Sequence, residues 1–376
     1  MARSLVLISG YYGFDNLGDE AILEQLVSEV KACSINAQDI VVLSNNPQLT
    51  SQQFAVNSVN RWSLKDIIAL LPRTRLFISG GGGLFQDTQS LKSIIYYGGL
   101  IALARVLGSK ILIYAQGLGP LRKPVSQSLT KQFLQLADKI CVRDDKSFKM
   151  LEQWGLKTKS IRTADPVWAL KPSMPPQAVS EQITVATTSK GKPSLIGISL
   201  RTGAGFSQTH LRKLVETLQS ALDPSVTLVM LPLQDEQDRP ILSSFADLWQ
   251  SKNQIIWLAP EAKLLPSQWL SLIASLDMVI GMRLHSLIMS LANGKPVVGI
   301  SYDAKVEIIL NQFAQPNLKF NPNQENEDKE DNKDWMATIE SALTNYSQLS
   351  SLANIEARNC REAACQNGAL IAKILA

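Results

Sequence analysis

The sequence has only four cysteines and two histidines among its 376 residues. The cysteines show neither CxxC nor zinc-like spacing, and they are Cys33, Cys141, Cys360 and Cys365. They indicate reduced thiols in a cytoplasmic protein, because disulfide frameworks belong to oxidising compartments. No group of His, Asp and Glu has the spacing of metal ligands either, so the sequence predicts no metal site.

Long apolar runs and a strong net charge are also missing. No run of about 18 apolar residues predicts a membrane span, and the apolar segment Ser4–Gly10 is short and lacks a signal-peptide cleavage pattern. Lys and Arg number 37 against 33 Asp and Glu, a net charge of +4. This small excess argues against a nucleic-acid-binding protein, which usually carries a clustered basic stripe. It leaves room for a basic pocket that binds a small anion.

Strand-like apolar runs alternate with amphipathic helical segments in two consecutive series, which predicts an α/β fold with two parallel sheets. The length also fits two domains. We expect an N-terminal domain over 1–170, a Pro- and Ser-rich linker over 171–194, a C-terminal domain over 195–347 and terminal helices over 348–376. Part of this tail is expected to pack back on the first domain.

Two stretches are predicted to lack regular structure. Pro47 is expected to begin a loop after the strand Ile40–Ser44. The segment Asn317–Asp334 is dense in Asn, Asp, Glu and Lys, which is typical of a mobile loop.

The segment Val279–Tyr302 has the pattern of a strand, a turn, a helix, a Gly-Lys-Pro stop and a second strand. Ligands of parallel sheets bind outside the carboxyl ends of the strands, where the turn Gly281–Ser286 falls. A helix N-terminus there suits an anion, and Arg283 and His285 add donors. A plain packing turn with a solvated Arg283 is the alternative. The other histidine, His210, begins a helix outside any motif and is expected to be structural.

The first half has a similar turn over Gly10–Glu20, between a strand and a helix that begins at Ala21. Asp19 is the candidate cap of that helix. The turn lacks the GxGxxG spacing of a dinucleotide site. Its acidic residues suit the hydroxyls of a sugar better than a pyrophosphate.

Two further strand ends in the first half are candidate ligand contacts. The four glycines Gly80–Gly83 allow either close approach of a ligand or tight packing of a strand on a helix. A flexible loop that binds no ligand is the alternative. Arg143 follows the strand Lys139–Val142 at the same edge. A solvated salt bridge from Arg143 to Asp144 or Asp145 is the alternative.

Five segments, in this order, resemble the polysaccharide pyruvyl transferase family, in particular its bacterial cell-envelope branch. They are Gly10–Glu20, Ser79–Asp87, Gln116–Pro120, Val142–Asp144 and Gly281–Ser286. The resemblance implies two Rossmann-like domains whose parallel sheets face a central cleft, as in glycosyltransferases of the B type. It implies transfer of the pyruvyl group of phosphoenolpyruvate onto two hydroxyls of one sugar, which forms a ketal. The implied acceptor is a lipid-linked cell-envelope sugar of the N-acetylmannosamine type.

The resemblance assigns phosphoenolpyruvate binding to Arg143, His285 and Lys305. His285 would also serve as general acid or base, because imidazole titrates near neutral pH. The acidic side chains of the first turn are the candidates to hold or deprotonate the acceptor hydroxyls, and the residues do not rank them: Asp15, Asp19 and Glu20. The remaining substrate-binding candidates are Gly13, Asn16, Gly81, Gly82, Gly83, Gln86, Asp87, Gln116, Arg283 and Ser286. The scheme requires no metal and no bound cofactor.

Two other functions stay open. One is a glycosyltransferase or epimerase that uses a nucleotide sugar on the same fold, with Glu307 as the candidate ribose contact. The other is a non-catalytic sugar-binding protein. The expected partners are phosphoenolpyruvate and a glycan or lipid-linked sugar, at the inner face of the plasma membrane, with peripheral contact through the acceptor lipid and no nucleic acid. The sequence does not reveal the oligomeric state.

Overall fold

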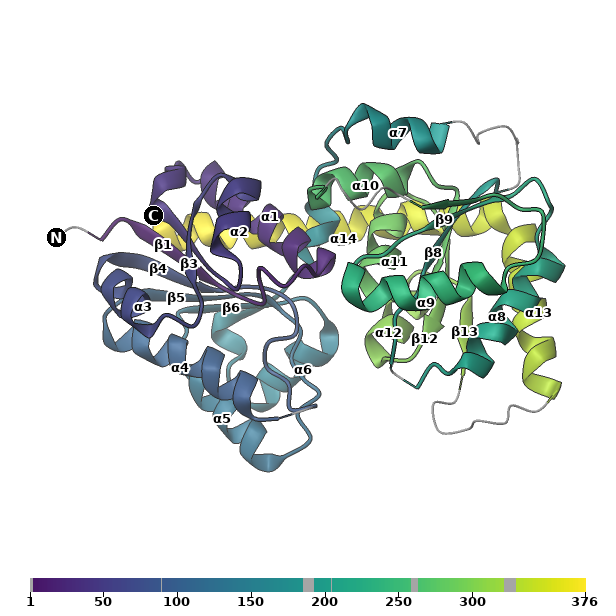
Figure 1. Cartoon of the computed structure of the whole chain (residues 1–376). Helices are drawn as coiled ribbons and strands as arrows, with labels where there is room; N and C mark the ends of the chain where they lie inside the picture. Colours follow the sequence, from purple (N-terminus) through teal and green to yellow (C-terminus); the bar gives the residue numbers. More distant parts are fainter. Residues whose placement is uncertain (1–2, 89, 185–192, 204, 258–262, 321–328) are drawn as a thin grey trace. The chain divides into compact units, whose positions relative to one another are not determined.

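The chain forms two compact units in a computed structural model that describes residues 3–88, 90–184, 193–203, 205–257, 263–320 and 329–376 (Figure 1). Unit 1 comprises Met1–Leu170 and Cys360–Ala376, and unit 2 comprises Lys171–Asn359. Each unit is a parallel sheet with helices packed around it (Figure 1). The prediction of two parallel α/β domains is therefore confirmed.

The sheet of unit 1 has the strand order β3-β2-β1-β4-β5-β6-β7. Its strands are β1 (Leu5–Ser9), β2 (Ile40–Ser44), β3 (Asn57–Asn60), β4 (Thr74–Ser79), β5 (Lys110–Gln116), β6 (Lys139–Val142) and β7 (Ser160–Arg162). Its helices are α1 (Leu17–Ala32), α2 (Pro47–Phe54), α3 (Leu64–Leu70), α4 (Lys92–Val106), α5 (Pro124–Gln135) and α6 (Asp145–Gln153). Every residue of β1 and β2 is buried, as expected for strands that helices cover on both faces.

The sheet of unit 2 has the order β10-β9-β8-β11-β12-β13. Its strands are β8 (Leu195–Ser199), β9 (Thr227–Met230), β10 (Ile255–Trp257), β11 (Met278–Gly281), β12 (Val297–Ser301) and β13 (Asn317–Lys319). Its helices are α7 (Gln177–Thr184), α8 (Gln208–Ala221), α9 (Asp235–Leu248), α10 (Pro266–Ala274), α11 (Leu284–Ala292), α12 (Ala304–Gln312) and α13 (Lys329–Thr344).

The last helix, α14 (Tyr346–Leu375), begins in unit 2, and its residues from Cys360 onward belong to unit 1. In unit 1 the side chains of Ala364, Asn367 and Ile371 are fully buried. The Asn367 amide donates to the carbonyl of Ala164 at 3.1 Å. The ammonium of Lys110 donates to the carbonyl of Ile374 at 2.7 Å.

The helix after the first turn begins earlier than predicted and has a different cap. It begins at Leu17, and the Asn16 side chain, rather than Asp19, accepts from the backbone N–H of Gly18 at 3.2 Å. The prediction that Pro47 begins a loop is wrong, because Pro47 occupies the first turn of α2. Proline suits that position because its missing N–H has no partner inside a helix.

The polar segment Asn317–Asp334 is not simply a loop. Asn317–Lys319 is the edge strand β13, and α13 begins at Lys329, while 321–328 lies outside the described residues. The predicted linker also contains helix α7. These elements are short or polar, so apolar periodicity gave no signal for them.

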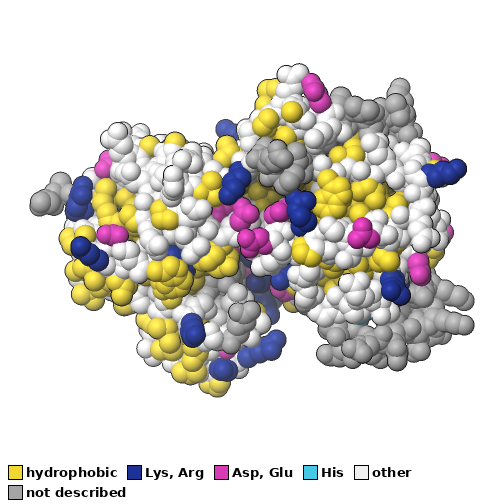
Figure 2. All heavy atoms as spheres, in the orientation of Figure 1, with side chains coloured by type: hydrophobic (Ala, Val, Ile, Leu, Met, Phe, Trp, Pro, Cys, Tyr) yellow, Lys and Arg dark blue, Asp and Glu magenta, His cyan; other side chains and the backbone are white. Residues whose placement is uncertain are grey.

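Within the described residues, no helix combines the length and the apolar character that a membrane crossing needs. Hydrophobic side chains are nevertheless exposed on unit 1 over the region of α3 and α4 (Figure 2). The most exposed, each more than half exposed, are Val106, Leu64, Trp62, Ile95 and Ile68.

Candidate functional site

In unit 1 the strands that follow β1 are first added on one side of it, and from β4 onward on the other side. In unit 2 the same change of side occurs between β8 and β11. Such switch points leave a crevice at the carboxyl ends of the two strands, which is where parallel sheets bind ligands. In unit 1 these ends lead into the loops after Ser9 and Ser79. In unit 2 they lead into the segments after Ser199 and Gly281.

The glycines of unit 1 are explained largely by packing within the loops. The ring of Tyr12, which is fully buried, occupies the space where side chains at Gly10 and Gly80 would lie. A Cβ at Gly81 would lie 2.8 Å from Ile22 of α1. Tight packing of a strand on a helix, one of the alternatives for these glycines, therefore applies at Gly81, whereas Gly80 packs on Tyr12 of the loop before α1.

Gly82 differs because its φ of +95° is a conformation that L side chains rarely adopt. A Cβ there would lie 2.9 Å from the Asp19 carboxylate. Gly82 also pairs with Gln116 at the end of β5, and its carbonyl accepts from the N–H of Gly117 at 2.8 Å. The structure thus brings three predicted site residues, Asp19, Gly82 and Gln116, to one edge of the sheet.

Gln116 itself holds the glycine loop in place. Its side chain is fully buried, its amide N–H donates to the carbonyl of Gly80, and its amide oxygen accepts from Leu84 N at 3.4 Å. Gly83 and Gln86, further along this loop, are half-buried. The backbone carbonyl of Gln86 accepts from the hydroxyl of Ser93 at 3.0 Å.

The structure separates the acidic candidates by environment. Glu20 Oε1 accepts from the backbone N–H of Gly13 at 2.7 Å, while Oε2 is buried without a hydrogen-bond partner among the described residues. Burial, and then the charges of Asp19 and Asp15, raise the pKa of Glu20 to about 8 against the opposing hydrogen bond from Gly13. Glu20 therefore carries a proton at neutral pH.

Asp15 and Asp87 differ from Glu20. Asp15 is exposed and has a φ of 57°. The Asp87 carboxylate accepts backbone N–H bonds from Arg122 at 2.9 Å and Lys123 at 2.8 Å, which lower its pKa to about 2. Asp87 thus anchors the segment that leads into α5 and is committed to the backbone.

Arg143 does not form the solvated ion pair considered as its alternative. Its guanidinium pairs with the carboxylate of Asp165, and the two side chains are 9% and 5% exposed. Asp144 instead caps α6, and Asp145 pairs with Arg162. A side chain at Gly117 would lie 2.9 Å from Arg143 Nε, so Arg143 lies against the turn after β5.

A cage of aromatic rings around Arg61 is a feature that the sequence did not predict. Arg61 is 3% exposed. Its guanidinium donates hydrogen bonds to the carbonyl of Gly10 at 2.9 Å and to the Tyr97 hydroxyl at 3.0 Å. The rings within 5.4 Å of its guanidinium are those of Phe14, Trp62, Tyr96 and Tyr97. Arg61 directly follows β3, so recognition of that short polar strand would have indicated it.

In unit 2 the turn after β11 opens α11 as predicted. Arg283 is the N-cap residue, and its side chain makes no capping hydrogen bond within the described part of the chain. His285 lies in the first turn of α11 and is half-buried. Ser286 is fully buried and donates to the carbonyl of Arg283 at 2.7 Å, so it closes the turn.

Arg283 is neither a solvated side chain nor an uncommitted cation. Its Nε donates to the two oxygens of Asp238 at 3.0 and 3.1 Å, and its side chain is 11% exposed against 0% for Asp238. Burial raises the pKa of Asp238, and the hydrogen bonds from Arg283 oppose that rise. The pair therefore fixes the start of α11 against α9.

Arg201 is a second cation at this edge that the sequence analysis missed. It follows β8 and donates from Nη1 to the hydroxyl of Tyr302 at 3.1 Å. Its guanidinium carbon also lies 5.3 Å from the centre of the Tyr302 ring. The strand-end rule that indicated Arg143 would have indicated Arg201 too.

Lys305 and Glu307 both lie in the first turn of α12. Lys305 is half-buried, and its backbone N–H is capped by Asp303 at 3.0 Å. Glu307 forms an exposed ion pair with Lys319 at 3.1 Å. His210 is buried, and its ring accepts from the N–H of Ser207 at 3.0 Å, as a structural role requires.

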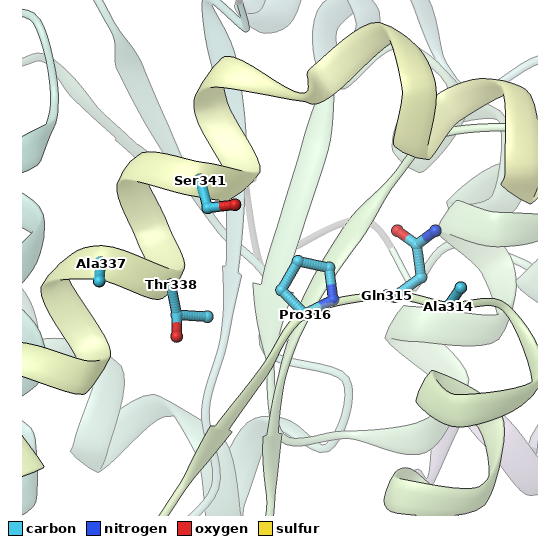
Figure 3. A pocket seen from close by; sticks show the side chains of 6 residues that line it. All are labelled: Ala314, Gln315, Pro316, Ala337, Thr338 and Ser341. Carbon is cyan, nitrogen blue, oxygen red and sulfur yellow. The ribbon is translucent and has the colours of Figure 1, made fainter.

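One cavity, of about 440 Å³, lies elsewhere in unit 2. Its lining residues are Ala314, Gln315, Pro316, Ala337, Thr338 and Ser341, from α13 and the segment that precedes β13 (Figure 3). This is the amino end of β13, opposite the edge that carries His285. The lining has no ionisable group, so it does not fit acid–base chemistry.

No three His, Cys, Asp or Glu side chains in the described part of the chain are placed to hold a metal ion. The absence of a metal requirement stays a prediction, as does closure of the two halves over one substrate.

The model of a family described as "Polysaccharide pyruvyl transferase" matches residues 16–304. No curated protein matches the chain significantly.

Several solved structures share the fold over almost the whole chain. Anabaena Alr3699/HepE in complex with UDP and glucose is 14% identical, with 98% of each chain covered and a TM-score of 0.60. The UDP-GlcNAc 2-epimerase from Neisseria meningitidis bound to UDP-GlcNAc is 12% identical, with 99% of this chain and 98% of the other covered and a TM-score of 0.63. At these identities the likeness shows the fold alone, which is of the glycosyltransferase B type.

Proposed function

We propose that this chain, which belongs to the polysaccharide pyruvyl transferase family, transfers the pyruvyl group of phosphoenolpyruvate onto two hydroxyls of one cell-envelope sugar. The product is a pyruvate ketal, and phosphate is released. The family match over residues 16–304 carries this proposal, because that range includes β4, β8 and β11 together with the turns that follow these strands.

The edge of unit 2 that carries α11 suits the donor. Phosphoenolpyruvate bears a carboxylate and a phosphate, nearly three negative charges at neutral pH. The start of α11 offers backbone N–H groups and a positive helix end, with His285 in its first turn. Lys305 opens α12, after the neighbouring strand β12. We assign donor binding to these two side chains. Arg143 of unit 1, which the resemblance also indicated, is paired with the buried Asp165.

The reaction requires a defined set of proton movements. A proton must reach the methylene carbon of phosphoenolpyruvate, so that its C2 becomes electrophilic and one sugar hydroxyl adds there. The C2–O bond to phosphate then breaks, and the second hydroxyl adds to C2. Each of the two sugar hydroxyls loses one proton. One of these protons returns to the acid that protonated the methylene carbon, and the other leaves with phosphate. We assign proton transfer to His285, since imidazole exchanges protons near neutral pH.

The acidic loop of unit 1 suits the acceptor. Asp19 lies against Gly82, and the protonated Glu20 is unsuited to be a base at neutral pH because of its raised pKa. We therefore assign Asp19 to hold the acceptor hydroxyls and Glu20 to support the loop through Gly13. We assign Asp87 no role in proton transfer, because its carboxylate accepts hydrogen bonds from the backbone N–H groups of Arg122 and Lys123.

A direct test is phosphate release from phosphoenolpyruvate by the full chain. Lipid-linked and simple amino-sugar acceptors of the N-acetylmannosamine type are compared with a reaction that lacks an acceptor. Acceptor-dependent release, with a product heavier by one pyruvate ketal in mass spectrometry, is the expected result. Absence of release with every acceptor would oppose the proposal.

A nucleotide-sugar enzyme is the second candidate, because structures of similar fold are described with UDP or UDP-sugars bound. Glu307, its candidate ribose contact, is paired with Lys319 in this chain. A panel of UDP- and GDP-sugars in the same assay separates the two functions. Consumption of a nucleotide sugar without phosphoenolpyruvate would favour this second function.

We further propose that the enzyme works in the cytoplasm, at the inner face of the plasma membrane. Its four cysteines are free, which fits a reducing compartment. The exposed apolar side chains over α3 and α4 would favour contact with the membrane that carries a lipid-linked acceptor. Sedimentation of the full chain with vesicles of bacterial lipid composition tests this location.

A further inference from the structure

We propose that Arg201 binds the phosphate group of the donor, at the start of α11 in unit 2. This inference rests on the proposed function only for the identity of the donor. The phosphate chemistry itself would be shared by phosphoenolpyruvate and by the diphosphate of a nucleotide sugar. The donor-binding residues that the sequence indicated do not include Arg201.

The sheet order places the Arg201 side chain across the turn that opens α11. Arg201 follows β8, and its partner Tyr302 follows β12. Strand β11 lies between them, so the two strand ends are about 9.5 Å apart, twice the usual spacing of neighbouring strands. A hydrogen bond from Arg201 to Tyr302 therefore spans the end of β11, where Gly281 leads into α11.

Charge pairing at this edge leaves Arg201 as the arginine available to an anion. The charge of Arg283 is neutralised by Asp238, whose side chain is fully buried. The Asp238 carboxylate accepts hydrogen bonds from both Nε and Nη2 of Arg283. Arg201, by contrast, contacts the neutral ring and hydroxyl of Tyr302. Asp238 influences Arg201 only through space, as a charge that already has a partner.

Two buried polar atoms beside the turn have no hydrogen-bond partner among the described residues. One is Nε of Arg201, and the other is the hydroxyl oxygen of the fully buried Ser199. Ser199 lies against Gly281, because a Cβ on that glycine would lie 3.0 Å from the Ser199 Cβ. A guanidinium N–H buried without an acceptor is unfavourable, and a phosphate oxygen at this place would satisfy it.

The switch-point rule identifies the same place independently. Strands β8 and β11 are the pair between which sheet growth reverses in unit 2. A crevice outside their carboxyl ends is where a ligand of this sheet would bind. Arg201 follows the first of these strands, and His285 follows the second. A planar guanidinium there can bind a phosphate through two parallel hydrogen bonds, which a lysine cannot.

The test uses the full chain with three variants at this edge and one matched control. Arg201→Gln removes the charge, Arg201→Lys keeps a point charge without the fork, and Tyr302→Phe removes only the hydroxyl. The control is Arg239→Gln, because Arg239 also pairs within its unit and lies 5.4 Å from a ring, that of Trp257. Thermal melting establishes that each variant is folded.

Binding of inorganic phosphate, phosphoenolpyruvate and UDP is measured by calorimetry without acceptor. We expect Arg201→Gln to weaken binding of the true donor about tenfold or more, and Arg201→Lys to weaken it less. Arg239→Gln should stay within twofold of the original chain. In turnover, Arg201→Gln should raise the KM for the donor and leave the KM for the acceptor within twofold.

Unchanged donor and phosphate affinity in a folded Arg201→Gln protein would overturn the role of Arg201. An equal loss of donor affinity in Tyr302→Phe would also overturn it. The loss would then come from the hydrogen bond between Arg201 and Tyr302 and not from a contact of Arg201 with phosphate. If Arg201→Gln does not fold, the same criteria apply to Arg201→Lys. Failure of the proposed function looks different, since the original chain would then not consume phosphoenolpyruvate, whereas Arg201-dependent UDP binding would still support the phosphate contact.

Discussion

Replacing the half-buried Glu20 with glutamine should remove a pH dependence from the folding stability of unit 1. In the folded chain the pKa of Glu20 is about 8, against an ordinary value of 4.5. Between these two pH values the folded chain holds one proton more than the unfolded chain. The stabilising contribution of this proton is complete below pH 4.5 and is lost as the pH rises to about 8, because stability falls when the unfolded state binds fewer protons.

The magnitude follows from the two pKa values. The folded and unfolded pKa values of Glu20 differ by about 3.5 units. At about 1.4 kcal/mol per unit, the free energy of unfolding falls by roughly 5 kcal/mol over the whole titration. Between pH 6 and 8 the loss is about 2 kcal/mol, because the unfolded chain is already deprotonated there and the folded chain is only half titrated at pH 8. Glutamine stays neutral throughout and can still accept the N–H of Gly13 through its amide oxygen.

The assay is urea unfolding at pH 6, 7, 8 and 9, with the free energy of unfolding compared between the original chain and Glu20→Gln. We expect the variant to gain about 2 kcal/mol relative to the original chain from pH 6 to 8, and little more above pH 9. Glu362→Gln, the same chemical change at an exposed position of α14, serves as the control. Parallel curves for Glu20→Gln and the original chain would refute a protonated Glu20.

Three other substitutions test the assigned roles. His285→Ala and His285→Gln should both lose about two to four orders of magnitude in turnover if His285 transfers a proton; near-normal turnover of the glutamine variant would reduce His285 to a ligand contact. Lys305→Ala should weaken phosphoenolpyruvate binding about tenfold to a hundredfold and acceptor binding little, and equal effects on both substrates in steady-state kinetics would contradict that role. Gly82→Ala should destabilise unit 1 by about 1–3 kcal/mol in thermal melting, because its φ of +95° strains any Cβ; an unchanged melting temperature would count against this constraint.

Apolar periodicity and strand-end glycines predicted the two parallel sheets and the turns that follow their strands, whereas the location of the sites stays a prediction. The turn after β11 opened α11 where it was expected, with His285 in the first turn. The same reasoning failed for α2, β3 and β13, whose residues are polar or begin with proline. Edge strands bury few side chains, so hydrogen bonding to a neighbouring strand, rather than an apolar pattern, creates them.

Side-chain partners distant in sequence could not be predicted at all. Arg143 pairs with Asp165, and Arg283 pairs with Asp238, which precedes it by 45 positions in the chain. Each arginine lies at the expected strand end, but only the folded chain shows that a buried carboxylate already binds it. Local spacing in the sequence predicts that an arginine lies at a sheet edge. Tertiary packing determines whether a carboxylate neutralises its charge before a ligand binds.

The division of α14 between the two units has a consequence for synthesis of the chain. The segment Met1–Leu170 of unit 1 precedes unit 2 in the chain, whereas its segment Cys360–Ala376 follows unit 2. Its Lys110 ammonium and Ala164 carbonyl gain their partners only when Ile374 and Asn367 have emerged. Unit 2 lies between these segments in the sequence, so it can complete its sheet while unit 1 still lacks part of its cover. Most of unit 1 is therefore translated before unit 2, yet unit 1 gains its last contacts after unit 2 is complete.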